Sequence, residues 1–101
     1  MISIELIYDA DCQNLKDART NLLHALQAAK VQPEWKEWVR SDPEAPTYVR
    51  TYGSPTILID GQDVADTTPS DGADSCRLYS DEKGQFHGAP SVEAIVSALR
   101  R

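Results

Sequence analysis

The stretch Gly53-Ser54-Pro55-Thr56-Ile57-Leu58-Ile59-Asp60-Gly61 decides the fold of this chain. Its apolar run predicts a short interior strand over residues 56–59, and Asp60-Gly61 is typical of a tight hairpin turn. Pro55 cannot donate a hydrogen bond to a sheet, so it belongs at the beginning of that strand. A proline there leaves a neighbouring backbone group available to another segment, such as an extended substrate.

Hydrophobic spacing predicts the elements that precede this strand. Residues 2–8 alternate between apolar and polar positions, which indicates a buried strand. Residues 13–30 carry apolar side chains at helical spacing, and Pro33 ends that segment. Residues 34–40, which include both tryptophans, read as a short polar strand at or near a sheet edge. We expect these two tryptophans, Trp35 and Trp38, to pack there rather than to form a binding platform.

The remaining elements are signalled by capping and turn residues. Ser41-Asp42-Pro43 predicts the start of a second helix, which Gly53 would end. Residues 62–75 read as a loop, and residues 85–87 as a weak strand. Ser91 would cap a last helix whose apolar side chains again fall at helical spacing.

The resulting order is strand–helix–strand–helix–strand–strand–helix. Strands that alternate with helices and end in a hairpin indicate an α/β sandwich with a mixed central β-sheet flanked by helices. A chain of 101 residues has room for one modest core, so we expect a single domain over residues 1–101.

Composition narrows the classes of partner. Ten basic and sixteen acidic residues give a net charge of −6, which argues against a nucleic-acid partner. Residues 1–7 have no basic segment ahead of their apolar run, and Glu5 interrupts that run. We therefore expect neither a signal peptide nor a membrane span, and we expect a cytoplasmic protein. Two cysteines and two histidines without paired spacing do not predict a structural zinc site, and no cofactor is implied.

The element order, a cysteine (Cys12) at the first strand–helix junction and a proline (Pro55) opening the third strand together resemble the thioredoxin superfamily. More narrowly, the chain is similar to small bacterial thioredoxin-like proteins with a single cysteine at the junction. Their second cysteine lies far downstream before Arg-hydrophobic-Tyr, as Cys76-Arg77-Leu78-Tyr79 does here.

The resemblance implies a thioredoxin-like three-layer sandwich and assigns roles to five residues. Cys12 would be the attacking thiol and Cys76 a possible resolving thiol. Ser54, Pro55 and Thr56 would hold the substrate, with Pro55 in the cis form and the Ser54 backbone facing the substrate.

The chain also departs from thioredoxins. The second active-site cysteine is replaced by Leu15, and Leu6 occupies the place of the buried acid. Asp11 stands where an aromatic residue would precede the site.

The chemistry of Cys12 leaves two interpretations open. At the start of a helix, unpaired N–H groups favour an anion, and Lys16 would help, whereas Asp9 and Asp11 would oppose it. The alternative is that Cys12 is a small apolar residue that closes the helix start. Pairing with Cys76 depends on where the chain returns after Asp60-Gly61, because a disulfide needs α-carbons within about 7 Å.

Three hypotheses follow for the function. The first is a monomeric thiol-disulfide oxidoreductase that acts on a protein or small-molecule thiol or disulfide. The second is a non-catalytic binding module that keeps the fold without the chemistry. The third is capture of a soft metal or mercurial by the two thiols. His24, His87 and the acids of residues 62–75 read as surface or loop residues rather than as metal ligands.

Overall fold

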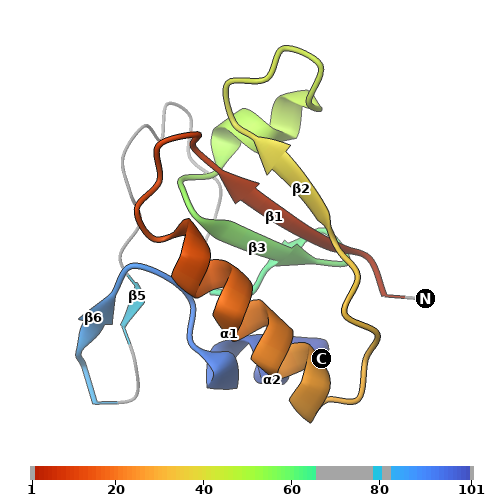
Figure 1. Ribbon diagram of the computed structural model, residues 1–101, viewed down its shortest axis with the longest axis vertical. Coiled ribbons are helices and arrows are strands. Elements are labelled where there is room, and N and C mark those ends of the chain that lie inside the picture. Colours follow the sequence, from red (N-terminus) through yellow and green to blue (C-terminus); the bar gives the residue numbers. More distant parts are fainter. Residues whose placement is uncertain (1, 66–78, 81–82, 101) are drawn as a thin grey trace.

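Four strands form one mixed β-sheet in the order β2-β1-β3-β4 (Figure 1). The computed structural model describes residues 2–65, 79–80 and 83–100. β1 pairs parallel with β2 on one side and antiparallel with β3 on the other, and β4 is antiparallel to β3. The strands span Ile4–Tyr8 (β1), Lys36–Val39 (β2), Thr56–Ile59 (β3) and Gln62–Asp63 (β4). The α/β class and the mixed sheet predicted from the sequence are thus confirmed.

Both α-helices lie on one face of this sheet, where α1 (Leu15–Ala28) contacts α2 (Val92–Leu99). Apolar side chains at helical spacing on α1 meet alternate residues of β1 and β3. They form the larger core cluster: Ile4, Leu6, Ala18, Leu22, Ala25, Leu26, Ile57, Ile59, Val64, Ala89, Ile95 and Ala98. The Ser91 hydroxyl accepts a hydrogen bond from the Ala94 N–H, so Ser91 caps α2 as predicted.

The opposite face is covered by a shorter element. The segment predicted as a second helix contains only a 3₁₀ helix, η1 (Thr47–Thr51). Pro46 explains the difference, because a proline disfavours helical geometry in the residue before it, and Pro46 itself is extended with ψ 148°. Beneath η1 lies a second, smaller core cluster of Ile7, Ala45, Val49 and Leu58.

The Asp60-Gly61 hairpin is confirmed. Both residues have positive φ, 51° at Asp60 and 82° at Gly61, as a tight two-residue turn of the primed type requires. The chain returns at once through β4, and the Val64 N–H donates to the Ile57 carbonyl at 3.0 Å. β4 is therefore the strand by which the chain returns antiparallel to β3, directly after the turn.

A separate two-stranded sheet joins β5 (Tyr79–Ser80) to β6 (Phe86–His87). β6 agrees with the weak strand predicted at residues 85–87. The chain then passes Gly88 on its way to α2, and Figure 1 shows this segment beside the beginning of α1. Asn14 is so close to Gly88 that a β-carbon at position 88 would lie 2.2 Å from Asn14 Cγ.

β2 lies at the edge of the four-stranded sheet, as its charges predicted. On the side of α1, Arg19 Nη2 lies 2.6 Å from Glu37 Oε1. The Trp35 indole N–H donates to Glu37 Oε2 at 3.0 Å, and Trp35 packs against the larger core cluster. The hydrogen bonds from Arg19 and from Trp35 lower the pKa of Glu37 against the opposing effect of its partial burial.

A matching arrangement lies on the side of η1. Here Glu5 of β1 accepts hydrogen bonds from the Trp38 indole, at 2.9 Å, and from the Tyr48 hydroxyl. The Lys36 ammonium lies 4.5 Å from the centre of the Trp38 ring. The hydrogen bond to Glu5, together with desolvation, raises the pKa of Tyr48 to about 12. Both tryptophans are thus packing residues at the sheet edge, which confirms the interpretation made from the sequence.

Candidate functional site

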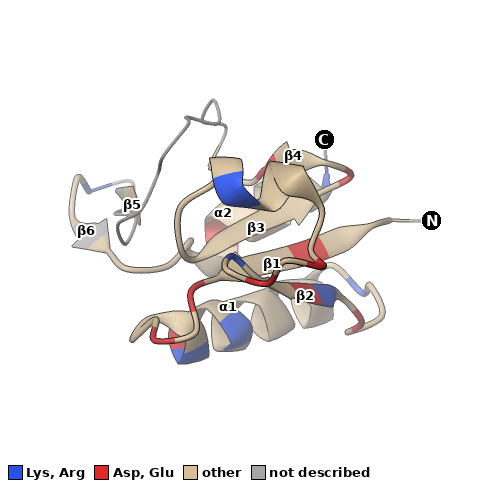
Figure 2. Ribbon diagram, turned by 90° about the horizontal axis from the view of Figure 1, so that it is seen from above, with Lys and Arg blue, Asp and Glu red and all other residues tan. Residues whose placement is uncertain are grey.

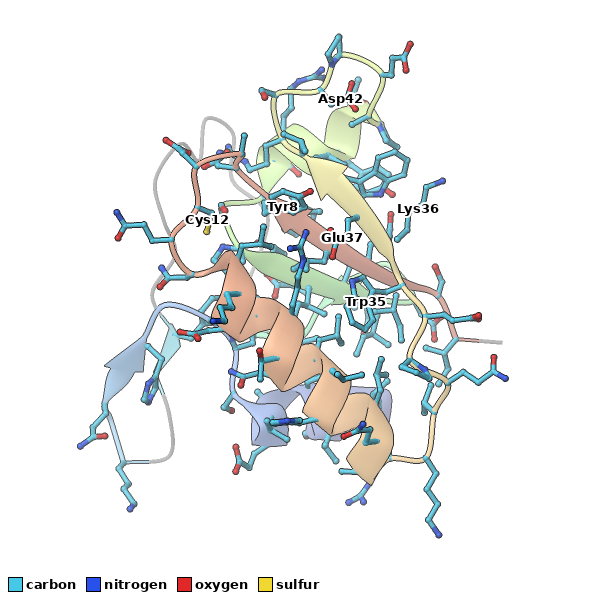
Figure 3. The ribbon with its side chains drawn as sticks, viewed as in Figure 1. Tyr8, Cys12, Trp35, Lys36, Glu37 and Asp42 are labelled. Atoms are coloured by element: carbon cyan, nitrogen blue, oxygen red, sulfur yellow. The ribbon has the colours of Figure 1, made fainter. Side chains whose placement is uncertain are left out.

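Cys12 lies in the turn that leaves the carboxyl end of β1 (Figure 3). Its N–H donates to the Asp9 carbonyl at 3.0 Å, which closes a β-turn over residues 9–12. The side chain is half-buried and its thiol is free. Because α1 begins at Leu15 with Asn14 as its N-cap, Cys12 precedes the helix by two residues more than the sequence predicted.

The turn of Cys12 is tied to the loop before β3. The Asp9 N–H donates to Ser54 Oγ at 2.9 Å, across 45 positions of sequence. Since Asp9 also binds the Cys12 N–H, one residue connects the thiol turn to Ser54 and its neighbour Pro55. The structure therefore links Cys12 to Ser54 through Asp9, and Pro55 and Thr56 follow Ser54 in the chain.

The three residues predicted to hold a substrate are fully buried. Ser54 uses its hydroxyl on Asp9, and Thr56 Oγ1 donates to the Gly53 carbonyl at 2.7 Å. The Ser54–Pro55 peptide bond is cis. We call the turn of residues 9–12 and the linked residues 53–56 the corner. The side chains of Ser54, Pro55 and Thr56 are buried inside it, while Cys12 is partly exposed.

An ion pair closes the corner from the side of β2. Arg40 directly follows β2, and its Nη1 lies 2.9 Å from Asp9 Oδ1 and 3.2 Å from Oδ2. The Arg40 N–H donates to the Tyr8 carbonyl at 2.8 Å, which continues the pairing of β2 with β1. The Arg40 side chain is only 12% exposed, so the pair is partly shielded from water.

Tyr79 reaches the same corner from β5. Its hydroxyl donates to the Pro55 carbonyl, and the residue is buried. Sequence reasoning missed both Arg40 and Tyr79 as neighbours of the site. The signal for Arg40 was its place after β2, because parallel neighbouring strands end at the same edge of a sheet.

Three other residues considered in the sequence analysis are Cys76, His24 and His87. Cys76, the predicted resolving thiol, lies outside the described residues. His24 is exposed on α1, as expected. His87 lies in β6 and lines an open groove of about 600 Å³ between α1, β6 and α2, together with residues that include Asp17, Asn21 and Glu93.

Two absences hold for residues 2–65, 79–80 and 83–100 alone. No three of their histidine, cysteine, aspartate or glutamate side chains are grouped so as to hold a metal ion. Within that same part of the chain, neither α-helix combines the length and the apolar character needed to cross a membrane.

Comparison with known proteins gives no relative: no family model, no curated protein and no solved structure matches this chain.

Proposed function

We propose that this chain is a thioredoxin-like thiol protein whose Cys12 exchanges with disulfides. The observation that supports the proposal most directly is the link between Cys12 and Ser54. A free, half-buried thiol lies in a turn that is hydrogen-bonded, through Asp9, to the residue before Pro55. Thiol–disulfide exchange needs an accessible thiolate held at a fixed place, and this corner provides the place and the access.

The topology supports a thioredoxin-like sandwich as the finer description of the fold. The sheet order is β2-β1-β3-β4, with β1 and β2 parallel and with β3 and β4 antiparallel to their neighbours. Two helices cover one face and η1 covers the other, so helical elements lie on both sides of the sheet. The sheet is small, since β4 has two residues.

The reaction that we propose has two steps. The Cys12 thiolate attacks one sulfur of a disulfide, forms a mixed disulfide with it and releases the other sulfur as a thiolate, which takes a proton from water. A second thiol then attacks the Cys12 sulfur, forms the new disulfide with it and releases the bound half of the substrate, also as a thiolate. If Cys76 supplies that second thiol, the protein is oxidised and the substrate is reduced by two electrons. If a small-molecule thiolate instead attacks the substrate sulfur of the mixed disulfide, Cys12 leaves as the thiolate and is regenerated, and the small molecule ends in a disulfide with the bound half of the substrate.

In this proposal the protein acts on a protein or small-molecule disulfide. It works as a monomer in the cytoplasm and needs no cofactor. Nothing in it requires a nucleic acid or a membrane.

Leu15 favours a second candidate function, a binding module that keeps the corner without the chemistry. Leu15 occupies the place of the second active-site cysteine in thioredoxins, and it packs against the larger core cluster. A leucine there is a structural residue and cannot resolve a mixed disulfide.

Intact-mass spectrometry with a small neutral disulfide separates the two. The full chain is incubated with 2-hydroxyethyl disulfide, and the mixed disulfide is followed in the wild type, Cys12→Ser and Cys76→Ser. We expect the adduct at Cys12 to form faster in the folded protein than in the protein denatured at the same pH. Cys12→Ser should abolish this fast adduct, whereas Cys76→Ser should lengthen its lifetime if Cys76 resolves it. A folded Cys12 that reacts more slowly than the denatured one would favour the binding module.

A further inference from the structure

Asp9 joins three parts of the candidate site through different atoms. Its N–H donates to Ser54, its carbonyl accepts from the Cys12 N–H, and its carboxylate accepts from Arg40. Each of these hydrogen bonds is between 2.9 and 3.2 Å long. The orientation of the thiol turn therefore depends on where this one residue is held.

Arg40 is the residue that holds Asp9 by its side chain. Its own backbone is fixed by the hydrogen bond to Tyr8, so the guanidinium extends from an anchored point at the end of β2. The exposed fractions of the two side chains are 12% for Arg40 and 27% for Asp9. Removing Arg40 from so shielded a pair takes away the positive charge that binds the Asp9 carboxylate.

The negative charge of Asp9 would then act on the thiol. Asp9 and Cys12 are the first and last residues of one β-turn, so their α-carbons lie within about 7 Å. This is shorter than the screening length of roughly 8–10 Å at moderate ionic strength. Asp11, which is exposed, adds a second carboxylate to the segment between β1 and α1, where Figure 2 shows acidic colouring.

We propose that Arg40 is a positioning residue for Cys12, which acts through Asp9. It fixes the turn that carries the thiol, and it cancels the charge of the carboxylate at the other end of that turn. Its biological role rests on the proposed function, in which Cys12 is the reacting group. Its direct consequence is that Arg40 and Asp9 together set which charge of reagent Cys12 accepts.

The test compares two alkylating reagents of similar size, neutral iodoacetamide and anionic iodoacetate. Both rates are measured at Cys12 of the folded full chain, at neutral pH and low salt. Trypsin separates the two cysteines, since Cys12 falls in the peptide of residues 1–16 and Cys76 in that of residues 51–77. The quantity of interest is the ratio of the iodoacetate rate to the iodoacetamide rate.

We expect Arg40→Gln to lower this ratio roughly two- to five-fold, because a bare carboxylate then repels the anionic reagent. Asp9→Asn, whose amide oxygen can still accept from Arg40, should raise the ratio by a similar factor. Arg40→Lys and the double variant Asp9→Asn with Arg40→Gln should both return it close to the wild-type value. All of these differences should shrink near 1 M salt.

Lys30→Gln is the matched control, since it removes one positive charge beyond the far end of α1, a helix of about 20 Å. A ratio that stays constant in Arg40→Gln and Asp9→Asn, or that moves in the same direction in both, would overturn the proposal. Should Arg40→Gln not fold, the rise in Asp9→Asn alone decides the matter. Alkylation measures the thiol and not turnover, so failure of disulfide exchange leaves this inference standing, and the reverse also holds.

Discussion

The two faces of the four-stranded sheet are stabilised in different ways. Among the described residues, the face covered by α1 and α2 buries twelve apolar or alanine side chains in one cluster. The face under η1 buries four, beside a network in which Glu5 binds Trp38 and Tyr48. The first face depends on volume and helical periodicity, whereas the second depends on a short 3₁₀ helix and on hydrogen bonds at its edge.

Two neighbours in β3 measure this difference most directly. Ile57 is buried under the α-helices and Leu58 under η1, so one strand presents one residue to each face. We expect Ile57→Ala to cost about 4 kcal/mol and Leu58→Ala about 2–3 kcal/mol in free energy of unfolding. The thinner cover over Leu58 can collapse more easily into the space that the side chain leaves.

Urea denaturation measures both variants, with the slope of the transition checked against the wild type. Equal losses, or a larger loss for Leu58→Ala, would contradict the comparison between the two faces.

The helix cap at Ser91 gives the next largest effect. Ser91→Ala removes the hydrogen bond from the Ala94 N–H, and we expect a loss of about 1 kcal/mol. Neither Pro46 of η1 nor Asn14 of α1 makes such a side-chain bond. Asn14→Ala, measured alongside by thermal unfolding, should therefore cost less through capping, and a cost as large as that of Ser91→Ala would argue against this.

On the α-helical face, the contribution of Glu37 to the free energy of unfolding depends on pH in the acid range. Its pKa is lower in the folded protein than the ordinary value of 4.5, mainly because Arg19 binds it. The stability it contributes is present above about 4.5 and is lost as the pH falls through the folded pKa. For a pair this exposed we expect at most about 0.5 kcal/mol. Glu37→Gln should flatten the acid side of the stability–pH curve, and a curve of unchanged slope below pH 5 would refute the assignment.

On the other face, the contribution of Tyr48 to the free energy of unfolding depends on pH in the alkaline range. We expect this to be the smallest of the effects on stability. Because the pKa of Tyr48 is raised to about 12 from 10, its contribution is present below pH 10 and is lost as the pH rises toward 12. Tyr48→Phe should remove this loss, and Glu5→Gln should reduce it. Absorbance titration of the wild type checks the same point, since a tyrosine of ordinary pKa at position 48 would contradict it.

The sequence predicted local features better than contacts between distant segments. β3 and its turn need only an apolar run and Asp60-Gly61, and α1 needs only its spacing, so both were found. The second helix was wrong because Pro46 disfavours helical geometry in the residue before it, which leaves only η1. The start of α1 was placed at residue 13 instead of Leu15, so Cys12 was expected directly beside a helix that begins two residues later.

In the candidate site too, the contacts between distant segments were not predicted from the sequence. Cys12, Ser54, Pro55 and Thr56 were singled out by their positions along the chain, and the structure links Cys12 to Ser54 through Asp9. Asp9 had been considered only as a negative charge, and Arg40 not at all, because their pairing needs the parallel register of β1 with β2. The Pro55 carbonyl accepts a hydrogen bond from Tyr79, which arrives from a strand in the separate sheet.

Because Asn14 lies so close to Gly88, the residue allowed at one of these two distant positions depends on the residue at the other. A side chain at position 88 would displace the Asn14 amide, which sits between Cys12 and α1. Drift at either position is therefore constrained by the other: a larger residue at 88 is compatible only with a smaller or rotated residue at 14. Among descendants of this sequence, we expect the two positions to change together, and libraries that randomise one should randomise both.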